Sequence, residues 1–532
     1  MTSYFSYFSP VPAFPSYTGP YVVGSIDVEI PVAELESPSP APDESISTIQ
    51  YRIFYPCEPE SSSKAQTVNW VPVPQRSHLS AFSRFAGAGS VLAEFVSFIP
   101  RLLHYIQIPV HKNAPLRQPD TSTSRWPVMI FSHGLGGSRN AYSQIIGSIA
   151  SHGMIVIAPE HRDGSTPVSY IRAVPSTETT TEKVDPQVGK KVVDYVRISH
   201  TPSPEVEQQR NAQLRTRLWE MGLVHDSLIK LDNGMSLTNL NSSSITLSPF
   251  KDKMDVHTPG KITFAGHSFG GATVTQLVKS TFYSPLTSSA PASYTPLFTP
   301  SSRSSIAEQI TPQTPLILLD VWCFPLRAES TRWLWDKPFP CYSTGGPGGA
   351  ALLAVESQAF FKWREHLQAT KRLLSPDPSS TSPHQNFNDS EGREIPTPNF
   401  YYAASSAHLS QSDFGILFPW FTKRFMAVQE PERIMRLNVR AVLQTLRNCG
   451  IEVSKTSHAD MELEDDKAAT TDDDTAILSS ELRGWNFIST DLSEGEAEAS
   501  KLMGKTPSSV DPSDAVIRNE VLENRKGKEV TT

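Results

Sequence analysis

The sequence predicts an α/β protein built on a mostly parallel β-sheet with helices on both faces. Short continuous apolar runs, typical of strands buried on both faces, occupy residues 128–131, 154–158, 262–265, 316–319 and 352–355. Helical patterns separate some of these runs: Ser203-Pro204-Glu205 starts one helix, and 431–448 forms another that stops before Gly450. Two segments of alternating polarity, 26–30 and 49–55, precede the runs and predict a half-buried antiparallel pair.

Composition indicates that part of the chain lies outside the packed core. Apolar residues make up 38% of the 532 residues, against about 45–50% in ordinary globular domains. Stretches rich in Ser, Thr, Pro or acidic residues predict insertions near 176–182, 240–249 and 375–397. We therefore expect a loose N-terminal arm over 1–19, one domain over 20–453, and an acidic, disordered tail over 454–532.

The charge distribution and the cysteines exclude several classes of protein. Residues 457–532 hold 18 acidic and 8 basic residues, which leaves 37 acidic and 39 basic residues elsewhere. This near-neutral body lacks the broad basic surface of a nucleic-acid-binding protein. There is no apolar run of about 18 residues, so no transmembrane helix is expected, and the N-terminus does not resemble a secretory signal. Four widely spaced cysteines favour free thiols in a reducing compartment, the cytoplasm.

The strongest chemical signal is a strand that runs into Gly-x-Ser-x-Gly and then into a helix. The strand 262–265 leads to Gly266-His267-Ser268-Phe269-Gly270-Gly271, and a helical pattern follows over 272–279. This context predicts a nucleophile elbow, in which glycines allow a tight turn that lifts the Ser268 hydroxyl above the sheet edge. The Phe269 amide then points to the same place from the helix N-terminus.

A second glycine-rich loop offers the matching backbone donor. The strand 128–131 opens into Ser132-His133-Gly134-Leu135-Gly136-Gly137. Such a loop exposes N–H groups, one of which can join the Phe269 amide in holding an oxyanion.

The acid and the base are expected after the serine. Asp320 follows the apolar strand 316–319, at the carboxyl edge where parallel sheets keep their sites. A carboxylate there can orient an imidazole and stabilise the imidazolium. The resulting order of nucleophile, acid and histidine is that of the α/β-hydrolases.

The histidine is a choice among four. His366 lies in an expected helix and is predicted to be at the surface, and His458 lies in the acidic tail. His408 follows the aromatic strand 400–404 and precedes Asp413-Phe414, whereas His384 lies within a Ser/Pro-rich insertion. We predict His408 as the base because a site needs a rigid support, with His384 as the alternative.

These motifs resemble the platelet-activating factor acetylhydrolase family, in its plasma and cytosolic type II branch. The matching stretches are 19–32, 131–137, 151–163, 266–273, 320–325 and 408–414. The resemblance implies an α/β-hydrolase fold and calcium-independent hydrolysis of short or oxidised sn-2 acyl chains of phospholipids, without a metal or organic cofactor. It implies a triad of Ser268, Asp320 and His408, and oxyanion amides from Leu135 and Phe269.

One departure from the family concerns the histidine. Animal members read His-Gln-Asn-Phe at the triad histidine, and this chain has those letters at 384–387. His408 nevertheless keeps the following Asp-Phe pair at the same offset, as fungal-type members do. Both histidines therefore remain candidates on the sequence alone.

Two aromatic groups have both a functional and an ordinary interpretation. Trp322 and Phe324 can wall an acyl pocket or belong to the core. The cluster Trp420-Phe421 and Phe425, beside Lys423 and Arg424, can meet a membrane surface transiently or be core. The expected partner is a phospholipid substrate. The alternatives are a general carboxylesterase or lipase with the same triad, and a non-catalytic scaffold that presents the acidic tail.

Overall fold

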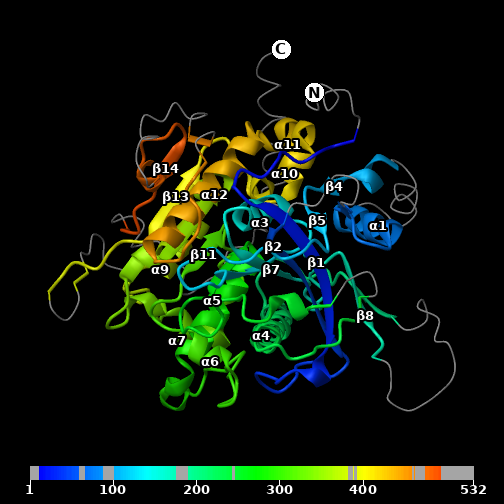
Figure 1. The fold of residues 1–532 in the computed structure, drawn as a ribbon. Helices are drawn as coiled ribbons and strands as arrows, with labels where there is room; N and C mark the ends of the chain where they lie inside the picture. The colour runs from blue at the N-terminus through cyan, green and yellow to red at the C-terminus, as the bar shows by residue number, and fades with distance from the viewer. Residues whose placement is uncertain are drawn as a thin grey trace.

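A computed structural model describes residues 11–58, 66–87, 101–174, 190–241, 246–380, 387–388, 392–457, 460–461 and 474–492. Its centre is a ten-stranded sheet in the order β14-β13-β12-β11-β10-β6-β7-β2-β1-β5 (Figure 1). The strands are β1 (Val22–Pro31), β2 (Thr48–Cys57), β5 (His111–Lys112), β6 (Val128–Ser132), β7 (Ile155–Pro159), β10 (Thr263–His267), β11 (Leu316–Leu319), β12 (Leu352–Ser357), β13 (Asn399–Ala403) and β14 (Trp485–Phe487). The strands from β7 to β13 in this order run parallel, and β2 and β14 join them antiparallel. The predicted α/β-hydrolase fold is confirmed.

Helices cover both faces of the sheet. The helices are α1 (Gln75–Phe85), α3 (Ser143–Ala150), α4 (Pro204–Asp232), α5 (Phe269–Phe282), α6 (Ile306–Gln309), α7 (Arg332–Trp335), α8 (Gln358–Lys362), α9 (Arg364–Leu374), α10 (Asp413–Leu417), α11 (Pro419–Met426) and α12 (Pro431–Asn448). The helices α3 and α12 pack on one face and α4 and α5 on the other, so two apolar layers form (Figure 1). Along β11, Leu316 and Leu318 enter one layer, while Ile317 and Leu319 enter the other. Two small ribbons, β3 (Val68–Asn69) with β4 (Gln107–Ile108) and β8 (Val168–Arg172) with β9 (Lys190–Asp194), complete the strands of the described residues.

The first two strands pair antiparallel as predicted, with Ile26 opposite Ile53, but they are not half-buried. Because β2 also pairs with β7, it lies inside the sheet, with α3 and α4 against it. The polar positions of the alternating pattern are therefore buried, and ion pairs compensate their charges. Asp27 lies 2.9 Å from Nε of Arg139 and 3.4 Å from Nη2 of Arg52. The alternation thus reflects a buried charge network, since a charge is tolerated inside a protein only when it is paired.

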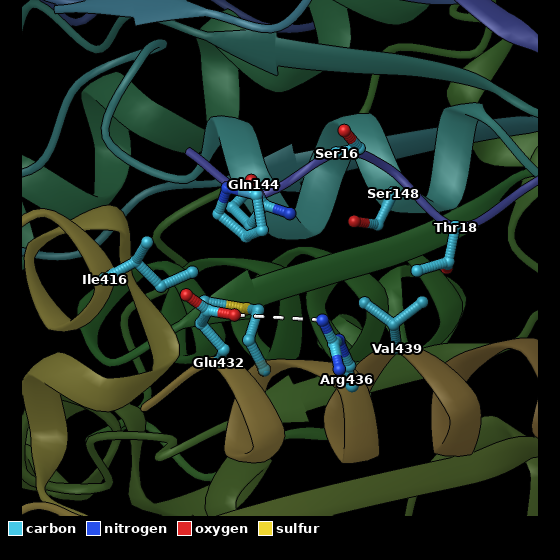
Figure 2. Close-up of a pocket in the computed structure, with 10 residues that line it drawn as sticks. Ser16, Thr18, Gln144, Ser148, Ile416, Glu432, Arg436 and Val439 are labelled. Carbon is cyan, nitrogen blue, oxygen red and sulfur yellow. Dashed lines mark ion pairs between the residues drawn. The ribbon is translucent and has the colours of Figure 1, made fainter. Parts of the chain in front are cut away.

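The expectation of a loose N-terminal arm is wrong for residues 11–19. The Tyr17 hydroxyl donates to the carbonyl of Ser143, at 3.0 Å. Its ring lies so close to Gly147 of α3 that a Cβ there would come within 2.0 Å of it. Figure 2 shows the same segment passing along α3, with Ser16 and Thr18 at the edge of a small pocket that α12 lines from the opposite side. Residues 1–10 lie outside the described part of the chain.

The predicted disordered tail is also wrong in part, because residues 474–492 fold onto the body. Strand β14 extends the sheet beside β13, and the Trp485 side chain is fully buried. Asp474 receives hydrogen bonds from Nε and Nη2 of Arg440, each at 2.7 Å, and both side chains are buried. The insertion 176–182 and parts of 240–249 and 375–397 lie outside the described residues.

Ending the chain after Val453 should therefore unfold or strongly destabilise the protein. The cut removes the carboxylate that pairs with the buried Arg440, which costs about 3–5 kcal/mol, and it removes the packing of Trp485. Thermal unfolding of the purified proteins measures this, and a chain ending at Leu492 is the matched control because it keeps both contacts. Equal melting temperatures for the two truncations would contradict the expectation.

Candidate active site

The turn between β10 and α5 has the geometry of a nucleophile elbow. Ser268 has φ 56° and ψ −118°, in the positive-φ half of the Ramachandran plot, which residues with a side chain rarely adopt. A Cβ at Gly270 would lie 1.9 Å from the Ser132 carbonyl oxygen, and one at Gly266 would lie 2.4 Å from Gly270. Glycine is therefore required at both flanking positions, as the motif predicts. The Ser268 side chain makes no helix-capping hydrogen bond.

Backbone hydrogen bonds bring Asp320 next to this serine. The Ser268 amide donates to the Leu319 carbonyl at 2.9 Å, and the Trp322 amide donates to the Ser268 carbonyl at 3.1 Å. Asp320, between these two residues, is fully buried, and its Oδ1 accepts from the Ser357 amide at 2.6 Å.

The structure pairs Asp320 with His408. Nδ1 of His408 lies 2.9 Å from Oδ2 of Asp320, which makes Nδ1 the donor and leaves Nε2 as the basic nitrogen. His384 lies outside the described residues. The prediction that His366 is at the surface is wrong: it is buried, and its Nε2 accepts from the Cys323 amide at 3.2 Å. Its helix, α9, packs into a core layer instead of lying free.

Among residues 134–137 of the loop after β6, one amide has no hydrogen-bond acceptor in the described part of the chain. The Gly134 amide donates to the Tyr142 hydroxyl at 3.1 Å, and those of Gly136 and Gly137 donate to backbone carbonyls at 2.8 and 3.1 Å. Within the described residues, the Leu135 amide has no recorded hydrogen bond. Phe269 is the first residue of α5, so its amide has no partner in the helix. These are the two amides predicted for the oxyanion.

Arg217 of α4, which the sequence reasoning missed, connects the two glycine-rich turns. It is fully buried, and its Nη1 donates to the His133 carbonyl at 2.7 Å. Its Nε donates to Asp163 at 2.6 Å, which neutralises the charge. The guanidinium carbon lies 4.5 Å from the Phe269 ring centre, and Nη1 also reaches Thr273 at 3.3 Å. No local motif marks this residue, because its contacts come from three distant segments.

Asp413 anchors the segment that carries His408. Its Oδ2 accepts from the Ser143 amide at 2.9 Å, the Ser143 hydroxyl at 2.6 Å and the Trp70 indole N–H at 2.9 Å. Its Oδ1 accepts from the Gln144 amide at 2.9 Å. Burial raises the pKa of Asp413 to about 6, although the hydrogen bonds from Ser143 and Gln144 act in the opposite direction. The carboxylate therefore ties this loop to the N-terminus of α3. In the sequence, the Asp413-Phe414 pair after His408 was the feature that could have indicated this role.

The predicted aromatic groups lie in different settings. Trp322 is buried, with its ring 6.0 Å from that of Phe269 and stacked on Phe324 at 5.7 Å. It therefore supports the elbow, and its part in an acyl pocket stays a prediction. Trp420 and Phe421 are exposed, at 73% and 44%, so the core interpretation is wrong for these two.

Among the described residues, His267, Asp320 and His408 form the only cluster that could hold a metal ion, with ligand atoms within 4.8 Å of one another. Asp320 and His408 already use their facing atoms on each other.

The four cysteines are free thiols, and the described helices include none that is long and apolar enough to cross a membrane. The pocket of Figure 2 lies between the N-terminal arm, α3 and α12 and contains none of the triad residues.

The chain is similar to known proteins across most of its length. A protein of Schizosaccharomyces pombe named "putative phospholipase A2" is 28% identical over 468 residues, which cover 84% of this chain and 94% of that protein. Platelet-activating factor acetylhydrolases of Canis lupus familiaris and Bos taurus are 31% and 32% identical over 225 residues, or 42% of this chain and 45% of theirs. A ferulic acid esterase from Streptomyces cinnamoneus aligns over 82% of this chain and 92% of its own, with 14% identity and a TM-score of 0.43.

A family model gives the clearest assignment. The model described as platelet-activating factor acetylhydrolase, isoform II, matches residues 7–339. This range contains Ser268, Asp320 and both glycine-rich turns, and it ends before His408. The pairing of His408 with Asp320 thus comes from the geometry and not from the matched range. The chain belongs to the platelet-activating factor acetylhydrolase isoform II family.

Proposed function

We propose that this protein is a calcium-independent serine hydrolase that cleaves the sn-2 acyl ester of platelet-activating factor-like phospholipids with acetyl, short or oxidised chains. Family membership supports a hydrolase of phospholipid esters. The observation that carries the proposal is the 2.9 Å bond between His408 and Asp320 beside the Ser268 elbow. The four free thiols support a reducing compartment, the cytoplasm.

The proposed reaction is acyl transfer in two steps. The Ser268 hydroxyl attacks the ester carbonyl and gives its proton to Nε2 of His408, while the Leu135 and Phe269 amides hold the oxyanion. The tetrahedral intermediate collapses, and the lysophospholipid oxygen leaves with the proton from His408. Water then gives a proton to the same nitrogen and attacks the acyl-enzyme, and His408 returns this proton to the Ser268 oxygen as the acid is released. Asp320 stabilises the imidazolium in both steps without taking the proton.

A substrate panel in the presence of excess chelator tests this function. The protein should release acetate from a 1-alkyl-2-acetyl phosphocholine lipid, and the rate should not change with the chelator, because backbone amides hold the negative charge. Equimolar mixtures of this lipid with a long-chain sn-2 lipid, or with a short aryl ester, measure which substrate the protein hydrolyses faster. Hydrolysis of the aryl ester alone would favour a general carboxylesterase, and rescue by calcium would contradict the mechanism.

We also propose that α11 meets the lipid surface. Trp420 and Phe421 are exposed, and the ring of Phe425 lies 6.1 and 5.0 Å from theirs. Lys423 and Arg424 are exposed on the same short helix. An apolar cluster beside cations suits the interface of an anionic membrane. The segment of His408 continues through α10 into α11, which connects the surface to the site along the chain (Figure 1).

Replacing both Trp420 and Phe421 with alanine should lower the activity on lipid vesicles about tenfold or more. Losing two aromatic anchors that the lipid would cover weakens interfacial binding by a few kcal/mol, at about 25 cal/mol per Å² of apolar surface. The rate on a soluble ester should remain within about twofold. Leu286→Ala is the control, since Leu286 is also an exposed apolar side chain, at 47%. Vesicle sedimentation should show the same ranking, and an equal loss on both substrates would argue against a membrane role.

A further inference from the structure

Two other rings contact the His408 ring. The Phe360 ring stacks on it with centres 4.6 Å apart and planes 6° apart. His267, the residue before the nucleophile, has its ring centre 4.3 Å away, with the planes 32° apart. These two rings and the hydrogen bond to Asp320 together restrain the position of His408.

His267 is itself held by a chain of hydrogen bonds that begins in the oxyanion loop. The Gly134 amide can only donate, so the Tyr142 hydroxyl oxygen accepts from it, at 3.1 Å. The Tyr142 oxygen lies 2.8 Å from Nδ1 of His267. Nδ1 is the acceptor that the hydroxyl proton of Tyr142 can reach. Nδ1 therefore accepts, and the remaining proton of the neutral ring is on Nε2. Nε2 is buried, close to the backbone of His408.

A neutral His267 suits a position beside the base. Burial lowers the pKa of His267 well below the ordinary value, and the charge of a protonated His408 lowers it further, although a hydrogen bond to the His408 backbone acts in the opposite direction. When His408 takes the serine proton, the adjacent ring therefore carries no charge that would repel the imidazolium. Tyr142 stays protonated as well, because burial raises the pKa of its hydroxyl above the usual value.

We propose that Tyr142 and His267 are positioning residues that couple the oxyanion loop to the catalytic base. Gly134, next to Leu135, is tied through Tyr142 to the ring that supports His408. A shift of the loop would be transmitted to the base, so the oxyanion donors and the proton acceptor are held in one mutual geometry. This inference rests on the proposed function, in which Leu135 and His408 serve the same transition state.

The test is a double-mutant cycle with Tyr142→Phe and His267→Phe, assayed on a soluble ester. Tyr142→Phe removes one oxygen atom, and His267→Phe keeps a ring beside His408 without the acceptor. Each single variant should lower kcat about 10–100-fold with KM within about twofold, since a displacement of about 1 Å costs such a factor. The double variant should fall within about threefold of the worse single variant, because both changes break one chain of contacts.

Tyr51→Phe is the matched control. Its hydroxyl is also buried and lies 3.0 Å from that of Ser227, away from the triad. This variant should lose similar thermal stability and keep kcat within about twofold. Tyr142→Phe with unchanged kcat, or multiplicative losses in the cycle, would overturn the inference.

Labelling of Ser268 by a fluorophosphonate separates this inference from the proposed function. Wild-type protein should be labelled rapidly, and Tyr142→Phe 10–100 times more slowly, in line with its expected kcat. A wild-type protein that is not labelled would instead count against the proposed function. Equal labelling rates in the two proteins would count against the positioning role alone.

Discussion

Replacing Ser268 with alanine should lower kcat by about 10³–10⁶ while the protein remains folded. The elbow presents this hydroxyl with no helix-capping bond, and the residual rate would come from the oxyanion amides and from binding alone. Alanine removes only the oxygen, and the strained backbone turn relaxes slightly if at all. The melting temperature should therefore stay close to that of the wild-type protein.

Steady-state kinetics on a soluble ester measure this loss, and peptide mapping after fluorophosphonate treatment locates the nucleophile. Ser280→Ala is a matched control because Ser280 is a buried serine on the same helix, hydrogen-bonded to Gln276 at 3.0 Å. It should keep its rate within about threefold. Near-normal activity of Ser268→Ala, or a label on another residue, would remove Ser268 from the mechanism.

The second large effect separates the two candidate histidines. His408→Ala should lower kcat/KM by at least ~10³, because no other described imidazole is bonded to Asp320 and able to accept the serine proton. His384→Ala should cost less than about threefold. The same variants differ in stability, since loss of His408 leaves the buried Asp320 carboxylate with the Ser357 amide as its remaining hydrogen-bond donor among the described residues.

Both histidine variants are assayed on the same soluble ester, with unfolding followed in parallel. His408→Gln distinguishes lost packing from lost chemistry, since it keeps most of the side-chain volume and cannot act as a base. It should be as inactive as the alanine variant and more stable. A larger loss in His384→Ala than in His408→Ala would show that the base lies in the His-Gln-Asn-Phe motif at 384–387 and not at the histidine bonded to Asp320.

The sequence by itself determined those parts of the site that depend on neighbours along the chain. The elbow occupies one strand–turn–helix segment, and the requirement for Gly266 and Gly270 follows from the turn alone. Asp320 was predictable because a parallel strand ends at the carboxyl edge of the sheet. The buried apolar runs likewise predicted the strands, with boundaries within about two residues.

The sequence did not decide between His408 and His384, because the general base is the histidine that contacts the acid in the folded protein. His408 and Asp320 are 88 positions apart, and only the packing of β13 beside β12 and β11 brings them together. The same reason explains why Arg217 and Tyr142 were missed. In the sequence, neither side chain differs from any other buried residue until the fold places the loops that they bind around them.

Tertiary structure alone also decided which ends of the chain belong to the domain. The region of Asp474 reads as an acidic, aperiodic tail, yet its carboxylate pairs with Arg440, and β14 completes the sheet beyond it. The polar positions of β1 and β2 predicted a solvated face, but Arg52 of β2 and Arg139 from another segment instead form ion pairs with Asp27 of β1. The periodicity of a strand shows which positions are polar. Only the folded chain supplies the oppositely charged partner that allows such a residue to be buried.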